Sequence, residues 1–151
     1  TMSVWFEGSS EIECSIQQVK HALENHGEHY VGVITRMPGL TSVELVEQGV
    51  DFVIIQTNEG LMKRTNISKQ IEVERVVVEF DEEYQASSKV TTMSHFFDKF
   101  STSDTGVKHH IVISNVEAPG VLGFFYRKLG SSNIGNAFLK SYKSYFEKQN
   151  P

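Results

Sequence analysis

The sequence is poor in cysteine and has no long apolar run. Its single cysteine, Cys14, cannot form an internal disulfide. No charged-then-apolar leader precedes the first predicted strand, and no apolar run approaches the roughly 20 residues needed to cross a bilayer. We therefore expect a cytoplasmic protein without an integral membrane segment.

Positive charge is also scarce. The 14 lysine and arginine residues are outnumbered by 19 aspartate and glutamate residues, which gives a formal net charge of -5 at pH 7. A chain with this balance offers no broad basic surface to a phosphate backbone. Nucleic acid is accordingly not expected as a partner.

Recognised motifs for catalysis and cofactor binding are missing as well. The glycine-containing stretches 120–123 and 130–135 lack the lysine followed by serine or threonine that a nucleotide-binding loop needs. No serine lies in a nucleophile-elbow pattern. His21, His26 and His29 have no acidic or cysteine partner at a recognised zinc spacing. We expect no cofactor and no metal. The lack of a catalytic motif also favours a non-catalytic protein over an enzyme.

What the sequence does contain is the composition of one globular domain, spanning residues 2–149. Hydrophobic residues make up 39% of the chain and charged residues 22%. Residues 4–13 alternate like a strand, with Phe6 and Gly8 on the inner face and Trp5 on the outer face. Gly8 either admits the close approach of a helix or widens a cavity.

One or two short helices follow this strand. A helix is predicted over residues 16–25, because Ser15 and Gln18 form a capping-box pattern ahead of apolar residues at helical spacing. Residues 26–37 fit a second short helix about as well as a strand. The Pro-Gly turn at residues 38–39 ends the segment in either case.

Six further segments are spaced like strands joined by tight turns, which gives seven strands in all. They cover residues 40–47, 51–57, 61 onward, 71–80, 84–100 and 107–117. The alternation changes phase between Val73 and Val76, which predicts a bulge near Arg75. An acidic turn is predicted at residues 81–83.

An amphipathic helix over residues 137–148 closes the chain. The strongly apolar residues 121–129 precede it, and Gly130 begins an interruption between the two parts. One helix that is kinked or unwound at Gly130 is the simplest interpretation.

This order of elements resembles the START-like superfamily, also called SRPBCC or the polyketide cyclase/dehydrase and lipid-transport group, with its birch-pollen-allergen-like members. The resemblance is carried by residues 6–15 with the following Val19, by the hairpin series after residues 38–39, and by residues 119–125. It implies an α+β helix-grip fold, in which a seven-stranded curved antiparallel sheet wraps around a long C-terminal helix. It also implies a cavity between sheet and helix, which the superfamily uses for lipids, hormones, polyketides, quinones or other apolar molecules.

Ten residues are candidates for contact with a molecule in such a cavity. Most are apolar or aromatic, as binding pockets are, and the alternative is that they fill a dry core. Thr92 and Ser94 are further polar positions beside the apolar ones. Of the consecutive His109 and His110, only one can point inward. The ten candidates are Phe6, Ile54, Arg75, Met93, Phe96, His109, Ile113, Phe124, Phe138 and Tyr142.

The leading functional hypothesis is a non-catalytic protein that encloses a small hydrophobic or amphipathic molecule. The first alternative is a cyclase or dehydratase acting on a polyketide-like or aromatic substrate, in which His109 or His110 with Tyr142 moves protons. The second alternative is a protein-interaction module, for which the outward-facing Trp5 is the only conspicuous seed of an apolar patch. The sequence identifies neither the ligand nor a protein partner.

Overall fold

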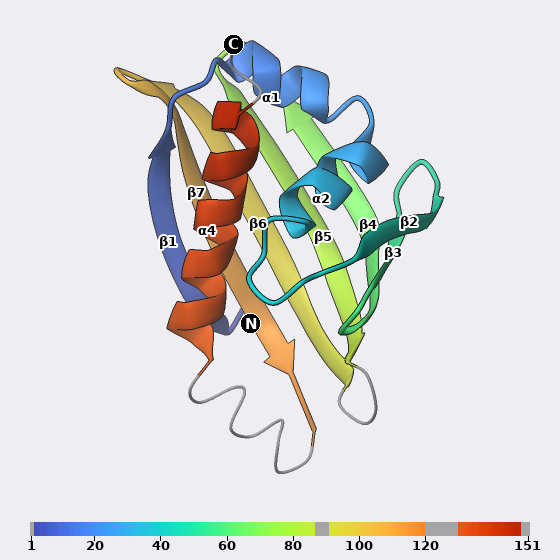
Figure 1. Cartoon of the computed structure of the whole chain (residues 1–151). Coiled ribbons are helices and arrows are strands. Elements are labelled where there is room, and N and C mark those ends of the chain that lie inside the picture. Colours follow the sequence, from blue (N-terminus) through green and yellow to red (C-terminus); the bar gives the residue numbers. More distant parts are fainter. Residues whose placement is uncertain (1, 87–90, 120–129, 149–151) are drawn as a thin grey trace.

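The computed structural model describes residues 2–86, 91–119 and 130–148. Its elements in chain order are β1 (Val4–Ile12), α1 (Ile16–Ala22), α2 (His26–Ile34), β2 (Val43–Gln48), β3 (Val53–Thr57), β4 (Gly60–Ile71), β5 (Arg75–Ala86), β6 (Thr91–Ser103), β7 (Gly106–Glu117) and α4 (Ser131–Lys148). Within these ranges seven strands form one antiparallel sheet in the order β1-β7-β6-β5-β4-β3-β2. Figure 1 shows the sheet curving around α4, with α1 and α2 on the same concave side. The expected α+β helix-grip architecture is confirmed.

The chain passes from β1 into the helices through the predicted capping box. The Gln18 N–H donates to Ser15 Oγ at 3.2 Å, and the Ser15 N–H donates to Gln18 Oε1 at 2.9 Å. Helix α1 ends at Ala22, three residues earlier than expected. The next segment is the helix α2 and not a strand, and the Glu28 N–H donates to the side chain of its N-cap, Asn25, at 3.1 Å.

The hairpin between β4 and β5 corrects the prediction of a bulge near Arg75. The phase of the alternation changes there because the chain reverses direction at residues 72–74. The turn is held by the Glu72 N–H, which donates to the Arg75 carbonyl oxygen at 2.8 Å. An ion pair of 2.7 Å joins Arg75 Nε to Glu72 Oε2 on the same turn.

The predicted acidic turn at residues 81–83 was also wrong, because these residues lie in the middle of β5. Glu82 is in phase with the buried Val78 and Phe80 and is itself buried. Its neighbour Asp81 points the other way and lies 2.8 Å from Nδ1 of His95. An inward-facing acid between two outward-facing ones therefore explains the run of carboxylates.

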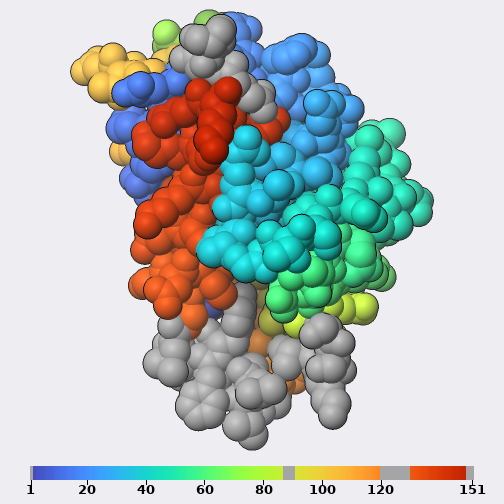
Figure 2. All heavy atoms as spheres, viewed as in Figure 1, coloured from blue at the N-terminus to red at the C-terminus, as the bar shows by residue number. Residues whose placement is uncertain are grey.

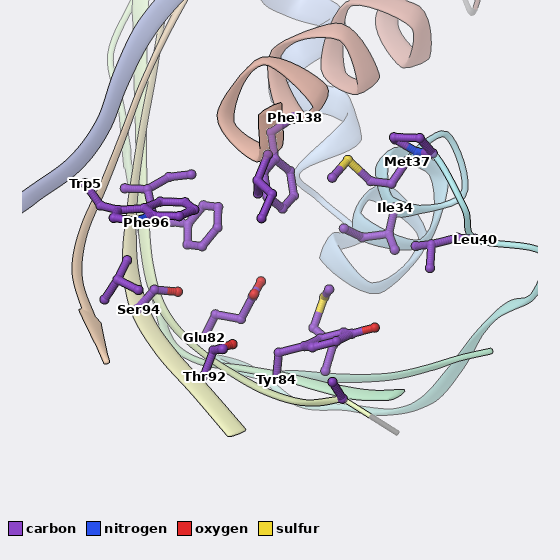
Figure 3. A pocket seen from close by; sticks show the side chains of 16 residues that line it. Trp5, Ile34, Met37, Leu40, Glu82, Tyr84, Thr92, Ser94, Phe96 and Phe138 are labelled. Atoms are coloured by element: carbon purple, nitrogen blue, oxygen red, sulfur yellow. The ribbon is translucent and has the colours of Figure 1, made fainter. Parts of the chain in front are cut away.

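Bulges occur elsewhere in the sheet. The register of β4 against β5 shifts between Thr65 and Ser68, where Asn66 has a φ of 55°. The register of β1 against β7 shifts between Val4 and Phe6. This irregularity turns Trp5 toward the concave side, so the prediction that Trp5 faces outward was wrong (Figure 3).

Helix α4 packs closely on β1 because each contributes a glycine at the contact. A Cβ atom at Gly8 would lie 2.9 Å from Phe6 Cζ and 3.1 Å from Leu139 Cδ1. A Cβ atom at Gly135 would overlap the Phe6 ring. Of the two predicted roles for Gly8, the structure therefore supports the close approach of a helix.

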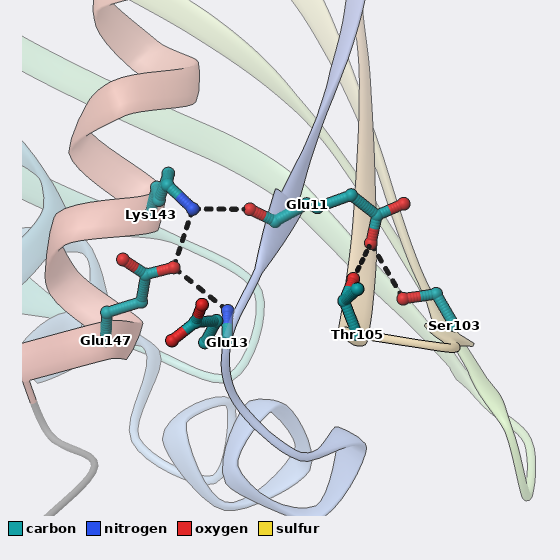
Figure 4. A network of polar contacts seen from close by, with 6 residues as sticks. All are labelled: Glu11, Glu13, Ser103, Thr105, Lys143 and Glu147. Carbon is teal, nitrogen blue, oxygen red and sulfur yellow. Dashed lines mark hydrogen bonds and ion pairs between the residues drawn. The ribbon is translucent and has the colours of Figure 1, made fainter.

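Two polar side chains fasten the C-terminal half of α4 to the end of β1 (Figure 4). Lys143 Nζ donates to the Glu11 carbonyl oxygen at 2.7 Å and also lies 2.7 Å from Glu147 Oε2. The Glu13 N–H donates to the same Glu147 oxygen at 2.9 Å. These hydrogen bonds to Glu13 and Lys143 lower the pKa of Glu147. We call this group of Glu11, Glu13, Lys143 and Glu147 the α4–β1 clamp.

The interior beneath the C-terminal half of α4 is filled by rings. Phe146 lies 5.8 Å from Phe100 and 5.7 Å from His29 between ring centroids, and Tyr142 lies 5.8 Å from Phe100. In the space-filling view α4 meets the α2 segment and together they cover much of the sheet (Figure 2). The apolar residues 121–129, predicted as the first half of the helix, lie outside the described residues.

Candidate functional site

The other half of the interior holds a cavity of about 410 Å³ between the sheet and the N-terminal half of α4 (Figure 3). Side chains from the sheet form one wall, and α4, the end of α2 and the loop after α2 form the other. The lining residues are Trp5, Ile34, Met37, Pro38, Leu40, Met62, Glu82, Tyr84, Ala86, Thr92, Ser94, Phe96, Ile113, Val116, Ile134 and Phe138.

Most of this lining is apolar or aromatic, and its polar groups are concentrated on the sheet. Glu82 on β5 lies directly opposite Ser94 on β6. Two residues further along β5, Tyr84 lies opposite Thr92. Tyr84 Oη lies 3.1 Å from Thr57 Oγ1, so that phenol already has a partner. A few polar groups in an apolar hollow are the usual composition of a small-molecule site.

Behind this wall lies a buried ion pair between Arg64 and Glu82. Arg64 Nε and Nη2 each lie 3.0 Å from Glu82 Oε2. The Arg64 side chain has no exposed surface, whereas 10% of the Glu82 side chain is exposed. Burial is the largest single effect and lowers the pKa of the guanidinium, but the charge of Glu82, the nearby Tyr142 and Tyr30 and the hydrogen bond to Glu82 together raise it, so the pKa of Arg64 is raised overall. The pair therefore presents its carboxylate to the cavity and keeps its guanidinium behind.

Aromatic rings surround the Arg64 guanidinium on its remaining sides. Its Cζ lies 4.4 Å from the ring centroid of Phe80, 4.7 Å from that of Tyr30 and 5.4 Å from that of Phe96. A cation over ring faces gains electrostatic attraction when it is shielded from water. These contacts fix Arg64, and through it Glu82, in one orientation.

A second buried polar pair lies in the filled half of the interior. His109 Nε2 lies 2.6 Å from Asp98 Oδ1, and neither side chain is appreciably exposed. The His109 ring stacks on Phe100 at 4.5 Å between centroids with an angle of 8° between the planes. Tyr142 closes the other side at 4.6 Å. Burial is the main cause that raises the pKa of Tyr142 well above its ordinary value.

His109 is the inward member of the histidine pair, because the neighbouring His110 faces the outside, where its Nε2 lies 2.8 Å from Glu7 Oε2. The inward histidine does not line the cavity, however. Its ring is enclosed by Asp98, Phe100 and Tyr142 in the packed interior.

The ten candidate residues fall into four groups, of which three can be located in the structure. Phe96, Ile113 and Phe138 line the cavity. Phe6, His109 and Tyr142 lie in the packed interior. Phe124 lies outside the described residues.

The remaining three candidates are away from the cavity. Arg75 is exposed in the β4–β5 turn, where it pairs with Glu72. Ile54 lies on the outer face of β3, between the inward-facing Val53 and Ile55. Met93 is half exposed on the outer face of β6. The predicted inward orientation of Ile54 and Met93 was wrong, because the predicted alternation had the wrong phase at these two positions.

Sequence reasoning missed three important members of the site: Trp5, Arg64 and Glu82. For the two charged residues a signal was present. Arg64 alternates in phase with Met62, and Glu82 with Phe80, so both occupy inward positions on their strands. Opposite charges at inward positions of two neighbouring strands indicate a buried pair. For Trp5 no signal was present, because a bulge reverses the phase.

The described residues contain no group of three histidine, cysteine, aspartate or glutamate side chains that could hold a metal ion. His26 Nε2 lies 2.7 Å from the Gly49 carbonyl oxygen, and Nδ1 lies 3.1 Å from Lys69 Nζ. None of the helices in the same ranges combines the length and hydropathy of a membrane-spanning segment.

Comparisons with known proteins find proteins of similar structure but none of significantly similar sequence. No protein-family model matches the sequence, and no curated protein matches it significantly. A conserved protein from Geobacillus kaustophilus aligns with a TM-score of 0.62 at 13% identity, over 95% of this chain and 92% of that one. A hypothetical protein from Helicobacter pylori aligns with a TM-score of 0.59 at 10% identity, over 93% and 86%.

A third similar structure is a fragment of a STAR-related lipid transfer protein from Xanthomonas axonopodis. It aligns with a TM-score of 0.58 at 11% identity, over 93% of this chain and 84% of that fragment. At such identities the likeness establishes the fold and leaves the activity open. The chain therefore has the START-like helix-grip fold that its sequence resembles.

Proposed function

We propose that this protein binds one small hydrophobic or amphipathic molecule in the cavity between the sheet and α4. The observation that carries the proposal is the cavity itself, about 410 Å³ in volume with a mostly apolar lining. Small-molecule sites commonly enclose roughly 300–1,000 Å³ and place a few polar groups in an apolar wall. The name of the Xanthomonas axonopodis protein of the same fold, a STAR-related lipid transfer protein, supports a lipid-like ligand.

The geometry gives less support to the two alternatives. A cyclase or dehydratase would need its proton-transfer groups in contact with the substrate, and neither His109 nor Tyr142 lines the cavity. A protein-interaction module would need an exposed apolar seed, and Trp5 lines the cavity. A cytoplasmic location, which the lone Cys14 favours, stays a prediction.

A pair of tryptophan substitutions on β6 tests the proposal. Thr92 lines the cavity, whereas Thr91, the preceding residue on the same strand, points to the other face. In titrations with a fluorescent apolar probe, we expect saturable binding to the wild type and to Thr91→Trp. Thr92→Trp fills the space and should weaken binding roughly tenfold or more, which is ~1.4 kcal/mol.

Two results would contradict the proposal. One is a wild-type protein that shows no saturable binding of any apolar probe. The other is equal binding by Thr92→Trp and Thr91→Trp, which would place the bound probe outside the cavity. Circular dichroism of both variants checks that each is folded before binding is compared.

A further inference from the structure

Three polar residues of the cavity lining, Glu82, Thr92 and Ser94, lie together on the sheet and form a polar spot. Glu82 and Ser94 are cross-strand partners on β5 and β6, and Thr92 lies two residues before Ser94 on the same face. Figure 3 shows the oxygen atoms of all three directed into the hollow from the sheet. The surrounding lining is largely apolar, so this spot determines which polar group a bound molecule can place there.

The two carboxylate oxygens of Glu82 have different surroundings. Oε2 accepts a hydrogen bond from Arg64 Nε at 3.0 Å and also lies 3.0 Å from Arg64 Nη2 as its ion-pair partner. Both contacts of the Glu82 side chain go to Oε2, and Oε1 accepts no hydrogen bond from any side chain in the described ranges. An ionised carboxylate only accepts hydrogen bonds, so Glu82 offers a free acceptor to the cavity.

A ligand meets this acceptor and not the guanidinium behind it. Arg64 has no exposed side-chain surface and is enclosed by Phe80, Tyr30 and Phe96. A ligand carboxylate would therefore approach another carboxylate in an apolar hollow, which is unfavourable for both charges. A cationic group would lose its hydration on entering the cavity. The Arg64–Glu82 pair has no net charge, so it would not compensate for that loss.

We infer that the ligand carries a neutral hydrogen-bond donor, an alcohol or phenol hydroxyl, at the end of an apolar body, and that this hydroxyl donates to Glu82 Oε1 beside Ser94 and Thr92. The inference rests on the proposed function, because it concerns the same cavity. It predicts that the protein selects hydroxylated apolar molecules and discriminates against fatty-acid-like carboxylates.

A panel of ligands with one alkyl chain length and different end groups tests the inference. The members are the primary alcohol, its methyl ether, the carboxylic acid and the primary amine, and their dissociation constants are measured at pH 7 by competition with the apolar probe. A hydrogen bond to a charged group is strong enough that loss of the donor should weaken binding by about tenfold or more. We expect the alcohol to bind most tightly, with the ether, the acid and the amine each at least about tenfold weaker.

The outcomes separate this inference from the proposed function. If the apolar probe binds but the acid, the amine or the ether equals the alcohol, the inference is overturned while the proposed function stands. If neither the probe nor any member of the panel binds in the cavity, both are overturned.

Replacement of the buried pair gives a second test. In the double variant Arg64→Met with Glu82→Leu, apolar side chains of similar size replace both charges, a change that buried ion pairs often tolerate. We expect this variant to bind the apolar probe but to lose its preference for the alcohol over the ether.

The exposed pair on the β4–β5 turn supplies a matched control. Arg75→Met with Glu72→Leu removes an arginine–glutamate pair of similar geometry outside the cavity, with an Nε–Oε2 distance of 2.7 Å. This control should keep the preference of the wild type. If the buried double variant does not fold, the wild-type panel decides by itself.

Discussion

His29 is a titratable residue that is almost completely buried. Its ring lies between 4.9 and 5.8 Å from the rings of Tyr30, Tyr142, Tyr145 and Phe146, and its Nδ1 atom has no hydrogen-bond partner in the described part of the chain. Burial first, and the positive charge of Arg64 second, lower its pKa from 6.5 to about 3. The imidazole is therefore neutral in the folded protein at pH 7.

This lowered pKa predicts a loss of stability in acid. The unfolded chain binds a proton at His29 below pH 6.5 and the folded chain does not until about pH 3, so folding stability falls as pH decreases through this window. The contribution of His29 approaches ~1.4 kcal/mol per pH unit. In urea unfolding at several pH values, His29→Phe should show a shallower loss of stability between pH 6.5 and 4 than the wild type.

Tyr30→Phe is the control for this measurement. It changes a ring next to His29, 4.9 Å away, without removing a group that titrates in acid. It should keep the pH dependence of the wild type, whatever its effect on stability at pH 7. Equal pH dependence in His29→Phe and the wild type would contradict the prediction.

The cavity residues differ in whether they could be predicted from the sequence. Phe96, Ile113 and Phe138 were expected inside and line the cavity, whereas Met93, three residues before Phe96 on β6, was also expected inside and faces outward. Arg64 and Glu82 were missed because charged residues are ordinarily assigned to the surface. Their burial depends on the pairing of β4 with β5, which sets Arg64 opposite Glu82, and that register could not be derived while residues 81–83 were taken for a turn.

At the scale of elements, the local signals that the sequence carries for helices were reliable. Both hydrogen bonds of the capping box at Ser15 are present. The boundaries of β4, β5 and β6 were less predictable, because the hairpin at residues 72–74 changes the phase of alternation just as the predicted bulge near Arg75 would have done. The number of strands was right because each predicted strand has a counterpart in the sheet, and only the segments predicted at residues 71–80 and 84–100 are shifted by several residues.

Loss of the helix cap at Ser15 has a measurable cost. Ser15→Ala removes the acceptor of the Gln18 N–H at the start of α1, and such caps contribute about 1 kcal/mol. We expect this decrease in the free energy of unfolding in urea. Ser9→Ala, on the exposed face of β1, is the control and should change stability by less than about 0.5 kcal/mol. A similar effect of the two substitutions would argue against a stabilising cap.

At the scale of the whole molecule, the interior is divided into a filled half and a hollow half. Phe146 belongs to the filled half and is fully buried among Phe100, His29 and Tyr145. Phe138, two turns earlier on α4, borders the cavity. In the sequence both residues belong to the amphipathic helix predicted over residues 137–148. Which of them faces open space depends on how α2 and its following loop meet the sheet, and no local pattern encodes that.

The two phenylalanines should respond differently to truncation. Phe146→Ala creates a new void in packed surroundings and should cost about 3–5 kcal/mol. Phe138→Ala enlarges a space that already exists and loses fewer contacts, so we expect a smaller cost, measured in the same urea unfolding experiment. A larger cost for Phe138→Ala would indicate that the cavity is closed in solution.

The α4–β1 clamp indicates which part of α4 can move relative to the sheet. It holds the last turns of α4 through Lys143 and Glu147, at the end of the helix that also rests on solid packing. The other end of the helix, from Ser131 to Phe138, borders the hollow and contacts β1 through the close packing of Gly135 on Phe6. We therefore expect ligand entry and exit to involve movement of the first turns of α4, while the clamped last turns stay packed on the sheet.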